Sequence, residues 1–306
     1  MNVKDKSAFD GVPSGFMALD CVTMGWQPSD LIVIAARPMI GKTAFGTSMV
    51  RNIAVNHKQG VAFFSLEMSV IQLMTRLVIA ETGLSGKDIK WGRLTPEQRR
   101  YLESGTKPLV TAPLFIDDTP ALSVFEFRSK ARRLKIHNDV KIIIIDYLQL
   151  MTGNQDSKGN REQEIDFILR TLKTVAVELN VPIIVFYMVS PISPWKRPQL
   201  SDLSQSSVIE QNADVVAFIH RPEYYGIDQD ENGMSTAGLA EIILAKHRNG
   251  AGCVINLRFV KEQVRFADLD DAIRPSLQAT DDEFTNSSKN YNAKWLIKVV
   301  LKLANK

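Results

Sequence analysis

The residues best suited to chemistry lie in the run Ala36-Arg-Pro-Met-Ile-Gly-Lys-Thr-Ala44, between an apolar stretch and a helical one. In a strand–loop–helix of this kind, backbone N–H groups point at phosphates, Lys42 reaches β- and γ-phosphate oxygens, and the Thr43 hydroxyl can hold Mg²⁺. The strict phosphate-loop pattern has Gly where this chain has Ala36, so an ordinary strand–turn–helix remains the alternative. The flanking pattern favours a nucleotide site, whose expected contacts are Ala36, Arg37, Pro38, Met39, Ile40, Gly41, Lys42, Thr43 and Ala44.

Two carboxylates follow other apolar runs and could act at the same edge of a sheet. Asp146 ends the run Ile142-Ile-Ile-Ile, which is typical of a parallel strand buried on both faces. Because ligands bind at the carboxyl ends of such strands, Asp146 can hold Mg²⁺ opposite the Thr43 hydroxyl; the alternative is an Asp that caps the next segment. Glu67, after residues 61–65, could orient and deprotonate the water that attacks a γ-phosphate, or could be a solvent-facing Glu favoured by a helix dipole.

A short basic segment, Lys246-His-Arg-Asn-Gly250, lies between two expected strands. One interpretation is a solvated turn, which is the usual role of cations at a hairpin edge. The other is that Lys246 and Arg248 reach the γ-phosphate bound by a neighbouring subunit. Since an arginine finger is worth about 10³–10⁵ in rate, Arg248 would then be a catalytic residue supplied to that subunit, with Lys246 beside it.

The composition is that of an ordinary globular protein. The chain has 306 residues, of which 45% are hydrophobic and 23% charged, enough for one large α/β domain or two small ones. A net charge of +3 is too small to indicate nucleic-acid binding by itself. The only cysteines, Cys21 and Cys253, lack metal-ligand spacing, residues 1–10 lack a signal-peptide core, and the apolar run at 181–189 is too short to span a membrane. We therefore expect a soluble cytoplasmic protein with reduced thiols.

Short apolar runs alternate with amphipathic segments, which predicts an α/β fold with a mainly parallel sheet and helices on both faces. The close spacing of the last three strands predicts an antiparallel edge. The expected strands are residues 31–35, 61–65, 114–116, 142–146, 182–187, 215–220, 241–245, 254–259 and 264–266. The expected helices are residues 43–56, 69–81, 95–106, 124–136 and 161–179.

Together these motifs resemble the RecA-like P-loop motor domain of the DnaB family of bacterial replicative DNA helicases. The resemblance covers residues 11–269, its order and spacing are specific, and the family often has Ala at position 36. The further segments that carry it are Gly11-Val-Pro-Ser-Gly-Phe16, Gly25-Trp-Gln-Pro-Ser-Asp-Leu31, Phe64-Ser-Leu-Glu-Met68, Phe115-Ile-Asp-Asp-Thr-Pro120, Ile145-Asp-Tyr-Leu-Gln-Leu150, Gly159-Asn-Arg-Glu-Gln-Glu164 and Ile209-Glu-Gln211.

The resemblance implies an activity, an assembly and a set of site residues. Members of the family are ring-shaped hexamers that use ATP and Mg²⁺ to move 5′→3′ on single-stranded DNA in DNA replication, where another replisome protein is a possible partner. The site residues that the resemblance implies are Lys42 and Thr43 for phosphates and Mg²⁺, Glu67 as the catalytic carboxylate, Asp146 as the second acidic motif, and Lys246 and Arg248 for the adjacent subunit's nucleotide.

The chain departs from the family pattern at the parts that sense nucleotide and contact DNA. A Ser-Gln-Leu-Ser-Arg signature is matched here from Tyr187 on, so Met188 replaces the Gln that senses the γ-phosphate, and a thioether is a poor hydrogen-bonding group. The DNA-contacting loop, usually Asp-Leu-Arg-Glu-Ser-Gly, is Asp202-Leu-Ser-Gln-Ser-Ser207. Ser204 thus replaces an Arg, which removes a phosphate contact, and Ser207 replaces a Gly.

These departures favour an alternative function, a degenerate ATP-binding relative with an interaction or regulatory role and no unwinding activity. A recombinase- or clock-type RecA-like ATPase is a third interpretation. The leading hypothesis remains an ATP-hydrolysing DNA helicase motor. It is the interpretation that fits the helicase-like segments Asp146-Tyr-Leu-Gln-Leu150 and Lys246-His-Arg248.

We divide the chain into a short arm at residues 1–10, a RecA-like ATPase domain at residues 11–270, and a linker and tail at residues 271–306. Because ten residues precede Gly11, we expect the family's N-terminal domain and linker helix to be missing. As a helix, residues 294–306 would be basic and amphipathic. Such a helix could bind an acidic partner, a membrane surface or DNA, or could pack its apolar face on the domain.

Overall fold

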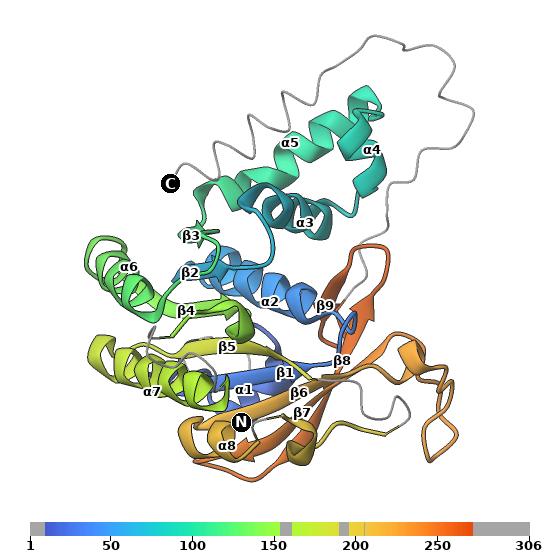
Figure 1. The fold of residues 1–306 in the computed structure, drawn as a ribbon. Helices are drawn as coiled ribbons and strands as arrows, with labels where there is room; N and C mark the ends of the chain where they lie inside the picture. The colour runs from blue at the N-terminus through green and yellow to red at the C-terminus, as the bar shows by residue number, and fades with distance from the viewer. Residues whose placement is uncertain (1–9, 154–160, 190–195, 205, 272–306) are drawn as a thin grey trace.

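The computed structural model describes residues 10–153, 161–189, 196–204 and 206–271, which are built around a nine-stranded sheet (Figure 1). The strand order is β3-β2-β4-β5-β1-β6-β7-β8-β9. The pairs from β3 to β6 in this order are parallel, and those from β6 to β9 are antiparallel. The expected mainly parallel sheet with an antiparallel edge is confirmed. The strands are β1 (Leu31–Ala36), β2 (Gly60–Ser65), β3 (Leu114–Asp117), β4 (Val140–Asp146), β5 (Ile183–Met188), β6 (Val215–His220), β7 (Leu239–His247), β8 (Cys253–Val260) and β9 (Arg265–Ala267).

Helices cover both faces of the sheet, also as expected (Figure 1). α2, α3 and α5 share one apolar cluster with the sheet, and α6, α7 and α8 share another. The helices are α1 (Met17–Thr23), α2 (Lys42–Arg51), α3 (Val70–Thr82), α4 (Gly86–Trp91), α5 (Pro96–Thr111), α6 (Val124–Asn138), α7 (Arg161–Leu179) and α8 (Ser206–Asn212), with the shorter turns η1 (Asn52–Asn56), η2 (Leu148–Leu150), η4 (Leu200–Asp202) and η5 (Pro222–Tyr225).

The central strands are continuously apolar because both of their faces are buried. Successive side chains of a strand point to opposite faces. In β1, Ile32 and Ile34 accordingly belong to one apolar cluster, and Leu31 and Val33 belong to the other. The sequence pattern that predicts buried parallel strands is therefore explained by the packing of both helical layers.

Three short helices, α1, α4 and α8, are absent from the sequence-based prediction. Each has six or seven residues, about two turns, which give too little periodicity to detect. The helix expected at residues 43–56 is α-helical only to Arg51 and continues as the π-helical turn η1. The remaining expected elements are present, with ends shifted by a few residues.

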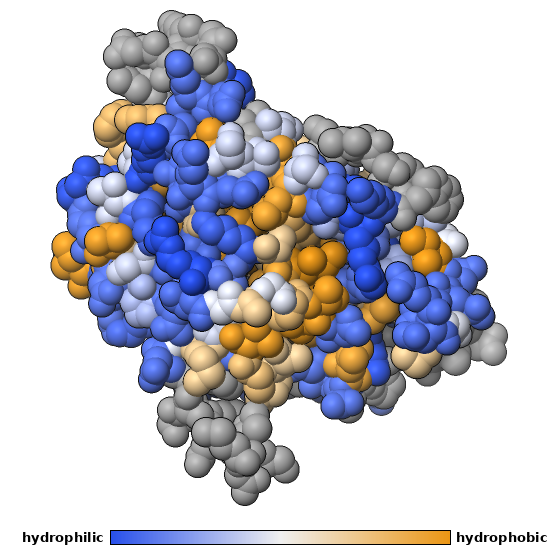
Figure 2. All heavy atoms as spheres, turned by 90° about the horizontal axis from the view of Figure 1, so that it is seen from below, coloured by the Kyte–Doolittle hydropathy of each residue, from blue (hydrophilic) through white to orange (hydrophobic). Residues whose placement is uncertain are grey.

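The predicted division into arm, domain and tail stays a prediction, because residues 1–9 and 272–306 lie outside the described residues. The basic helix expected at residues 294–306 is among them. Within the described ranges, no helix has both the length and the apolar character needed to cross a membrane. Figure 2 shows that apolar side chains nevertheless gather across the middle of the face seen from below, among hydrophilic ones.

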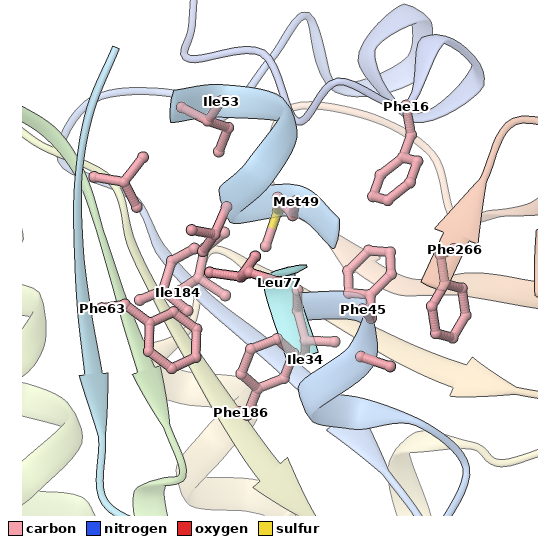
Figure 3. Packing of buried hydrophobic residues seen from close by; sticks show 14 of the residues in the cluster. Phe16, Ile34, Phe45, Met49, Ile53, Phe63, Leu77, Ile184, Phe186 and Phe266 are labelled. Carbon is pink, nitrogen blue, oxygen red and sulfur yellow. The ribbon is translucent and has the colours of Figure 1, made fainter. Parts of the chain in front are cut away.

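The core around α2 is closely packed (Figure 3). The Phe45 ring stacks on Phe16 with 5.2 Å between centroids and meets Phe266 edge-on at 5.4 Å. Gly46, the next residue of the helix, faces the buried ring of Phe186, and a Cβ atom there would lie 2.8 Å from its Cε2 atom. Glycine at this position therefore lets α2 approach the sheet.

We expect Gly46→Ala to lower the free energy of unfolding by about 1–3 kcal/mol, because the added methyl group overpacks the core against Phe186. Gly105→Ala in α5 is the matched control, since its Cβ would lie 3.2 Å from Thr82 Cγ2 and the change adds about 1 kcal/mol of helix propensity. Urea denaturation followed by circular dichroism measures both effects. Equal changes for the two variants would contradict the close approach at Gly46.

Candidate nucleotide site

Residues 36–44, here called the phosphate cradle, connect β1 to α2 at the carboxyl edge of the sheet. β1 ends at Ala36, and Gly41 precedes α2 with φ at +108°, a conformation that other residues resist. The first turn of an α-helix offers backbone N–H groups to an anion, and the helix dipole favours negative charge there. Val189 N donates to the carbonyl oxygen of Ala36 at 2.9 Å, which ties the cradle to the end of β5. The local geometry suits phosphate binding.

Four of the predicted site residues meet at this edge. Asp146 is completely buried, and its two carboxylate oxygens accept hydrogen bonds from the Lys42 ammonium and, at 2.7 Å, from the Thr43 hydroxyl. Lys42 Nζ also lies 3.7 Å from Glu67 Oε2, and Glu67 is half-exposed. The strands explain the convergence, because β2 pairs with β4 in a register that puts Ser65 opposite Asp146. Both carboxylates therefore end at one edge.

The ring of Tyr147 completes the surroundings of Lys42. The ammonium nitrogen lies 4.1 Å from the centroid of this ring, close enough for a cation–π contact. Burial raises the pKa of Tyr147, and the charges of Glu67 and Asp146 raise it further. The phenol therefore stays neutral, and Lys42 is the positive charge that these two carboxylates share.

The donor set suits Mg²⁺ bound together with a nucleotide. Within the described residues, no group of three or more His, Cys, Asp or Glu side chains could hold a metal ion. Thr43 and Asp146 offer two hard oxygen ligands side by side. Mg²⁺ is commonly held by one or two protein oxygens and takes its other ligands from phosphates and water, so these two residues fit a metal that arrives with a polyphosphate.

The cradle is also held by residues that the sequence analysis missed. Arg221 follows β6, and its Nη1 donates to the carbonyl oxygen of Ile40 at 3.3 Å. The same guanidinium lies 3.6 Å from the ring centroid of Phe259, on the antiparallel edge. Phe259 and Phe266 both pack against Gly41. The one available signal was the position of Arg221 directly after a buried strand; the aromatic residues follow only from how the sheet closes.

Arg37 connects the cradle to the segment before α8. Its Nη2 donates to the carbonyl oxygen of Lys196 at 2.9 Å and lies 3.9 Å from Asp202 Oδ2. The side chain is buried and lies 5.5 Å from the ring centroid of Tyr225. Arg37 was predicted only as a nucleotide contact; its observed contacts are with the protein, on the side of the predicted DNA-contacting loop.

Lys246 and Arg248 lie at the opposite edge of the sheet. Lys246 Nζ donates to the carbonyl oxygens of Glu210 and Ala213. Arg248 Nη1 donates to Asp214 Oδ1 at 2.7 Å, and the Arg248 side chain is 57% exposed. Asp214 precedes β6 and also accepts a hydrogen bond from Leu31 N, the first residue of β1.

The length of β1 therefore separates this pair from the cradle of the same chain. Its six residues span about 20 Å at ~3.3 Å per residue. The structure does not bring Lys246 and Arg248 together with Lys42. Their expected role at a neighbouring subunit's nucleotide stays a prediction, and it is the only nucleotide role open to them in this conformation.

His220 ends β6 beside the cradle and is buried. Its ring stacks on Tyr225 with 5.6 Å between centroids. Burial lowers the pKa of His220 to about 4; Glu241 opposes this decrease, while Arg37 and Arg197 add to it. The imidazole is therefore neutral in the folded protein at neutral pH.

Comparison with known proteins gives a consistent family. The family model described as DnaB-like helicase C terminal domain matches residues 11–268. The replicative DNA helicase DnaB of Geobacillus stearothermophilus is 43% identical over 263 residues, which are 85% of this chain and 57% of that protein. The replicative DNA helicase DnaC of Bacillus subtilis is 42% identical over 268 residues, 87% of this chain and 58% of that protein. This chain thus spans less than two thirds of the length of these relatives.

Solved structures agree. One solved structure, of an isolated ATPase domain, superposes with a TM-score of 0.79 at 33% identity, covering 87% of this chain and 94% of that one. A DnaB-like replicative helicase, solved in a study of its interactions with primase, has a TM-score of 0.79 at 32% identity, covering 87% of this chain and 64% of that one. The RecA-like fold expected from the sequence is confirmed.

We expect the protein to lose stability through His220 as the pH falls from 7 to 5. The folded-state pKa of about 4 lies below the usual value of 6.5, so the unfolded chain takes up the proton first. The linked loss is about 2 kcal/mol between these two pH values. Urea unfolding at both measures it for the unmodified chain and for His220→Phe, which keeps an aromatic ring against Tyr225 but cannot titrate.

The matched control for this measurement is His137→Phe, at an exposed position near the end of α6. It should leave the difference in unfolding free energy between pH 7 and pH 5 unchanged. An equal pH dependence in the unmodified chain and in His220→Phe would show that His220 is not buried in its neutral form.

Proposed function

The chain belongs to the DnaB-like helicase C-terminal domain family, and from this premise we propose that it is the ATP-hydrolysing motor of a cytoplasmic replicative DNA helicase that moves 5′→3′ on single-stranded DNA. The observation that carries the proposal is the convergence of Lys42, Thr43, Glu67 and Asp146 at one edge of the sheet. Relatives named as replicative DNA helicases support the activity. Because this chain spans only part of their length, their activity and partners come to it as proposals.

Each group of the site has a task in phosphoryl transfer, which depends on positioning and on charge stabilisation. Backbone N–H groups of the cradle and the Lys42 ammonium bind the β- and γ-phosphates of ATP. Thr43 and Asp146 hold Mg²⁺, which neutralises charge that develops on the phosphate oxygens. Glu67 is half-exposed and therefore open to water; its carboxylate orients the attacking water and accepts its proton.

Catalysis also needs positive charge on the far side of the γ-phosphate, and we assign this charge to Lys246 and Arg248 of an adjacent copy. Two observations support the assignment: the pair lies at the edge opposite its own cradle, and Arg248 is largely exposed. A homo-oligomer is required, and a hexameric ring is the proposed form. The apolar patch on the face seen from below is consistent with contacts between copies (Figure 2).

The proposed DNA contact is the loop that begins at Asp202, of which residues 202–204 and 206–207 are described. Its connection to the cradle through Arg37 supports this assignment. Single-stranded DNA is therefore the proposed track. Another replisome protein is a further proposed partner, since one structural relative was solved in a study of its interactions with primase.

We expect the unmodified chain to hydrolyse ATP with Mg²⁺, and single-stranded DNA to increase its turnover. Lys42→Ala should reduce turnover by at least about 10²-fold, because the developing phosphate charge loses its ammonium partner. Lys141→Ala, at an exposed lysine on β4 that pairs with Asp139, is the matched control and should be fully active. A phosphate-release assay with and without oligo(dT) measures all three.

A fully active Lys42→Ala variant would contradict the assignment of the cradle. If ATP is hydrolysed but turnover is unchanged by DNA over a range of salt concentrations, the motor function is wrong. The alternative function, a degenerate ATP-binding protein with an interaction or regulatory role, would then hold. Met188 and Ser204 are the residues that motivate that alternative.

We expect mixtures of Arg248→Ala and Glu67→Ala chains to regain activity that neither variant has alone. An interface that joins an intact Glu67 to an intact Arg248 is complete, and random mixing forms it at about a quarter of the interfaces. Turnover should therefore rise to about a quarter of that of the unmodified chain in a 1:1 mixture. Phosphate release measured across mixing ratios tests this.

A mixture of Lys42→Ala with Glu67→Ala chains is the matched control. Both changes damage the same cradle, so no interface of that mixture is complete and no activity should return. Absence of recovery in the Arg248→Ala mixture as well would rule out the role of Arg248 in a neighbouring site.

A further inference from the structure

Tyr187 is buried near the carboxyl end of β5, a strand that pairs with β1. Its side chain is 2% exposed. Its hydroxyl group hydrogen-bonds with the side chains of Ser204 and Gln149. The register pairs Tyr187 with Ala35, one residue before the phosphate cradle. This hydroxyl therefore lies where the strand end, the segment after Asp146 and the loop at residues 202–204 meet.

Gln149 fixes one side of this junction. It lies in η2, three residues after Asp146, and its side-chain amide donates to the carbonyl oxygen of Met188 at 2.8 Å. The same amide accepts a hydrogen bond from Met188 N at 3.2 Å. The next backbone group, Val189 N, donates to Ala36 O. The end of β5 is thus tied to both nucleotide-binding segments by its backbone, whatever side chain stands at position 188.

The hydroxyl of Tyr187 is suited to join two polar side chains. Burial raises the pKa of Tyr187, with Ser204, Arg161 and Gln149 opposing the increase, so the group keeps its proton at neutral pH. A phenol can donate one hydrogen bond and accept others. Arg161 Nη2 also donates to the backbone carbonyl oxygen of Gln149 at 2.8 Å, which holds that residue in place.

Ser204 is the exposed end of this connection. It stands where the family loop has an Arg, and Tyr187 stands where the family strand end has a Ser. The two departures from the family pattern are therefore in contact with each other. Met188, between Tyr187 and Val189, carries a side chain that is a poor hydrogen-bonding group, so its side chain offers no polar link of its own.

We propose that the Tyr187 hydroxyl is a positioning group that holds the loop at residues 202–204 against the nucleotide site, and that nucleotide binding changes the affinity for single-stranded DNA through this hydroxyl. The inference rests on the proposed function, in which that loop contacts DNA. Coupling between two sites is a ratio of affinities and is the same seen from either site. The ratio can therefore be read from DNA binding without turnover.

The test measures the dissociation constant for fluorescent oligo(dT) by anisotropy, with and without a non-hydrolysable ATP analogue and Mg²⁺, on the full chain. Tyr187→Phe removes only the hydroxyl and keeps the packing of the ring. We expect it to reduce the ratio of the two dissociation constants about fivefold, the usual net effect of one hydrogen bond. Tyr101→Phe, on α5, is the matched control and should leave the ratio unchanged.

Ser204→Ala and the double variant complete a thermodynamic cycle. If the Tyr187–Ser204 hydrogen bond carries the coupling, the double variant should show no greater loss than either single variant, because the second change removes nothing further. Losses that multiply would mean that the two hydroxyls act separately, and would overturn the proposal.

Two other outcomes would also overturn it. Equal weakening of DNA binding with and without nucleotide would make Tyr187 a structural residue only, and an unchanged ratio in Tyr187→Phe would exclude it altogether. Failure of the proposed function is distinguishable, because it is seen in the unmodified chain before any variant is made: oligo(dT) then does not bind, or binds with no nucleotide effect, and the proposal falls with it.

Discussion

The nucleotide site depends on one buried charge, the carboxylate of Asp146. A carboxylate out of contact with water is stable only when it is paired and hydrogen-bonded. Lys42 and Thr43 meet this requirement, and both belong to the first turn of α2. The same contacts therefore fix the start of α2 against the end of β4 and define the path of the chain through Gly41.

The antiparallel edge of the sheet supports the cradle from the other side. Phe266 N, on β9, donates to Ser48 Oγ of α2 at 2.9 Å, and the ring of Phe266 contacts Phe45. Arg221 adds a hydrogen bond to Ile40 from the end of β6. Segments that follow the cradle at a long distance in the sequence thus hold it in shape, which gives the antiparallel extension a role in nucleotide binding as well as in stability.

The sequence predicts those features that depend on local pattern or on the general geometry of parallel sheets. The Ile142–Ile145 run predicts β4, and the rule that strand ends share an edge predicts that Asp146 lies near Lys42. Arg221, Phe259 and Phe266 could not be predicted in the same way, because their contacts depend on where the antiparallel strands lie. Gln149 was within a quoted motif, but its clamp on the Met188 backbone appears only once β4 and β5 are neighbours.

The placement of Arg248 on Asp214, one strand length from the cradle, also sets the symmetry of any active assembly. A donor and an acceptor at opposite edges of one subunit fit a heterologous, head-to-tail interface rather than a two-fold one. In an open row of copies joined in this way, the cradle at one end receives no arginine. Closure of the row into a ring completes that last site, so the number of complete sites equals the number of subunits only in the closed form.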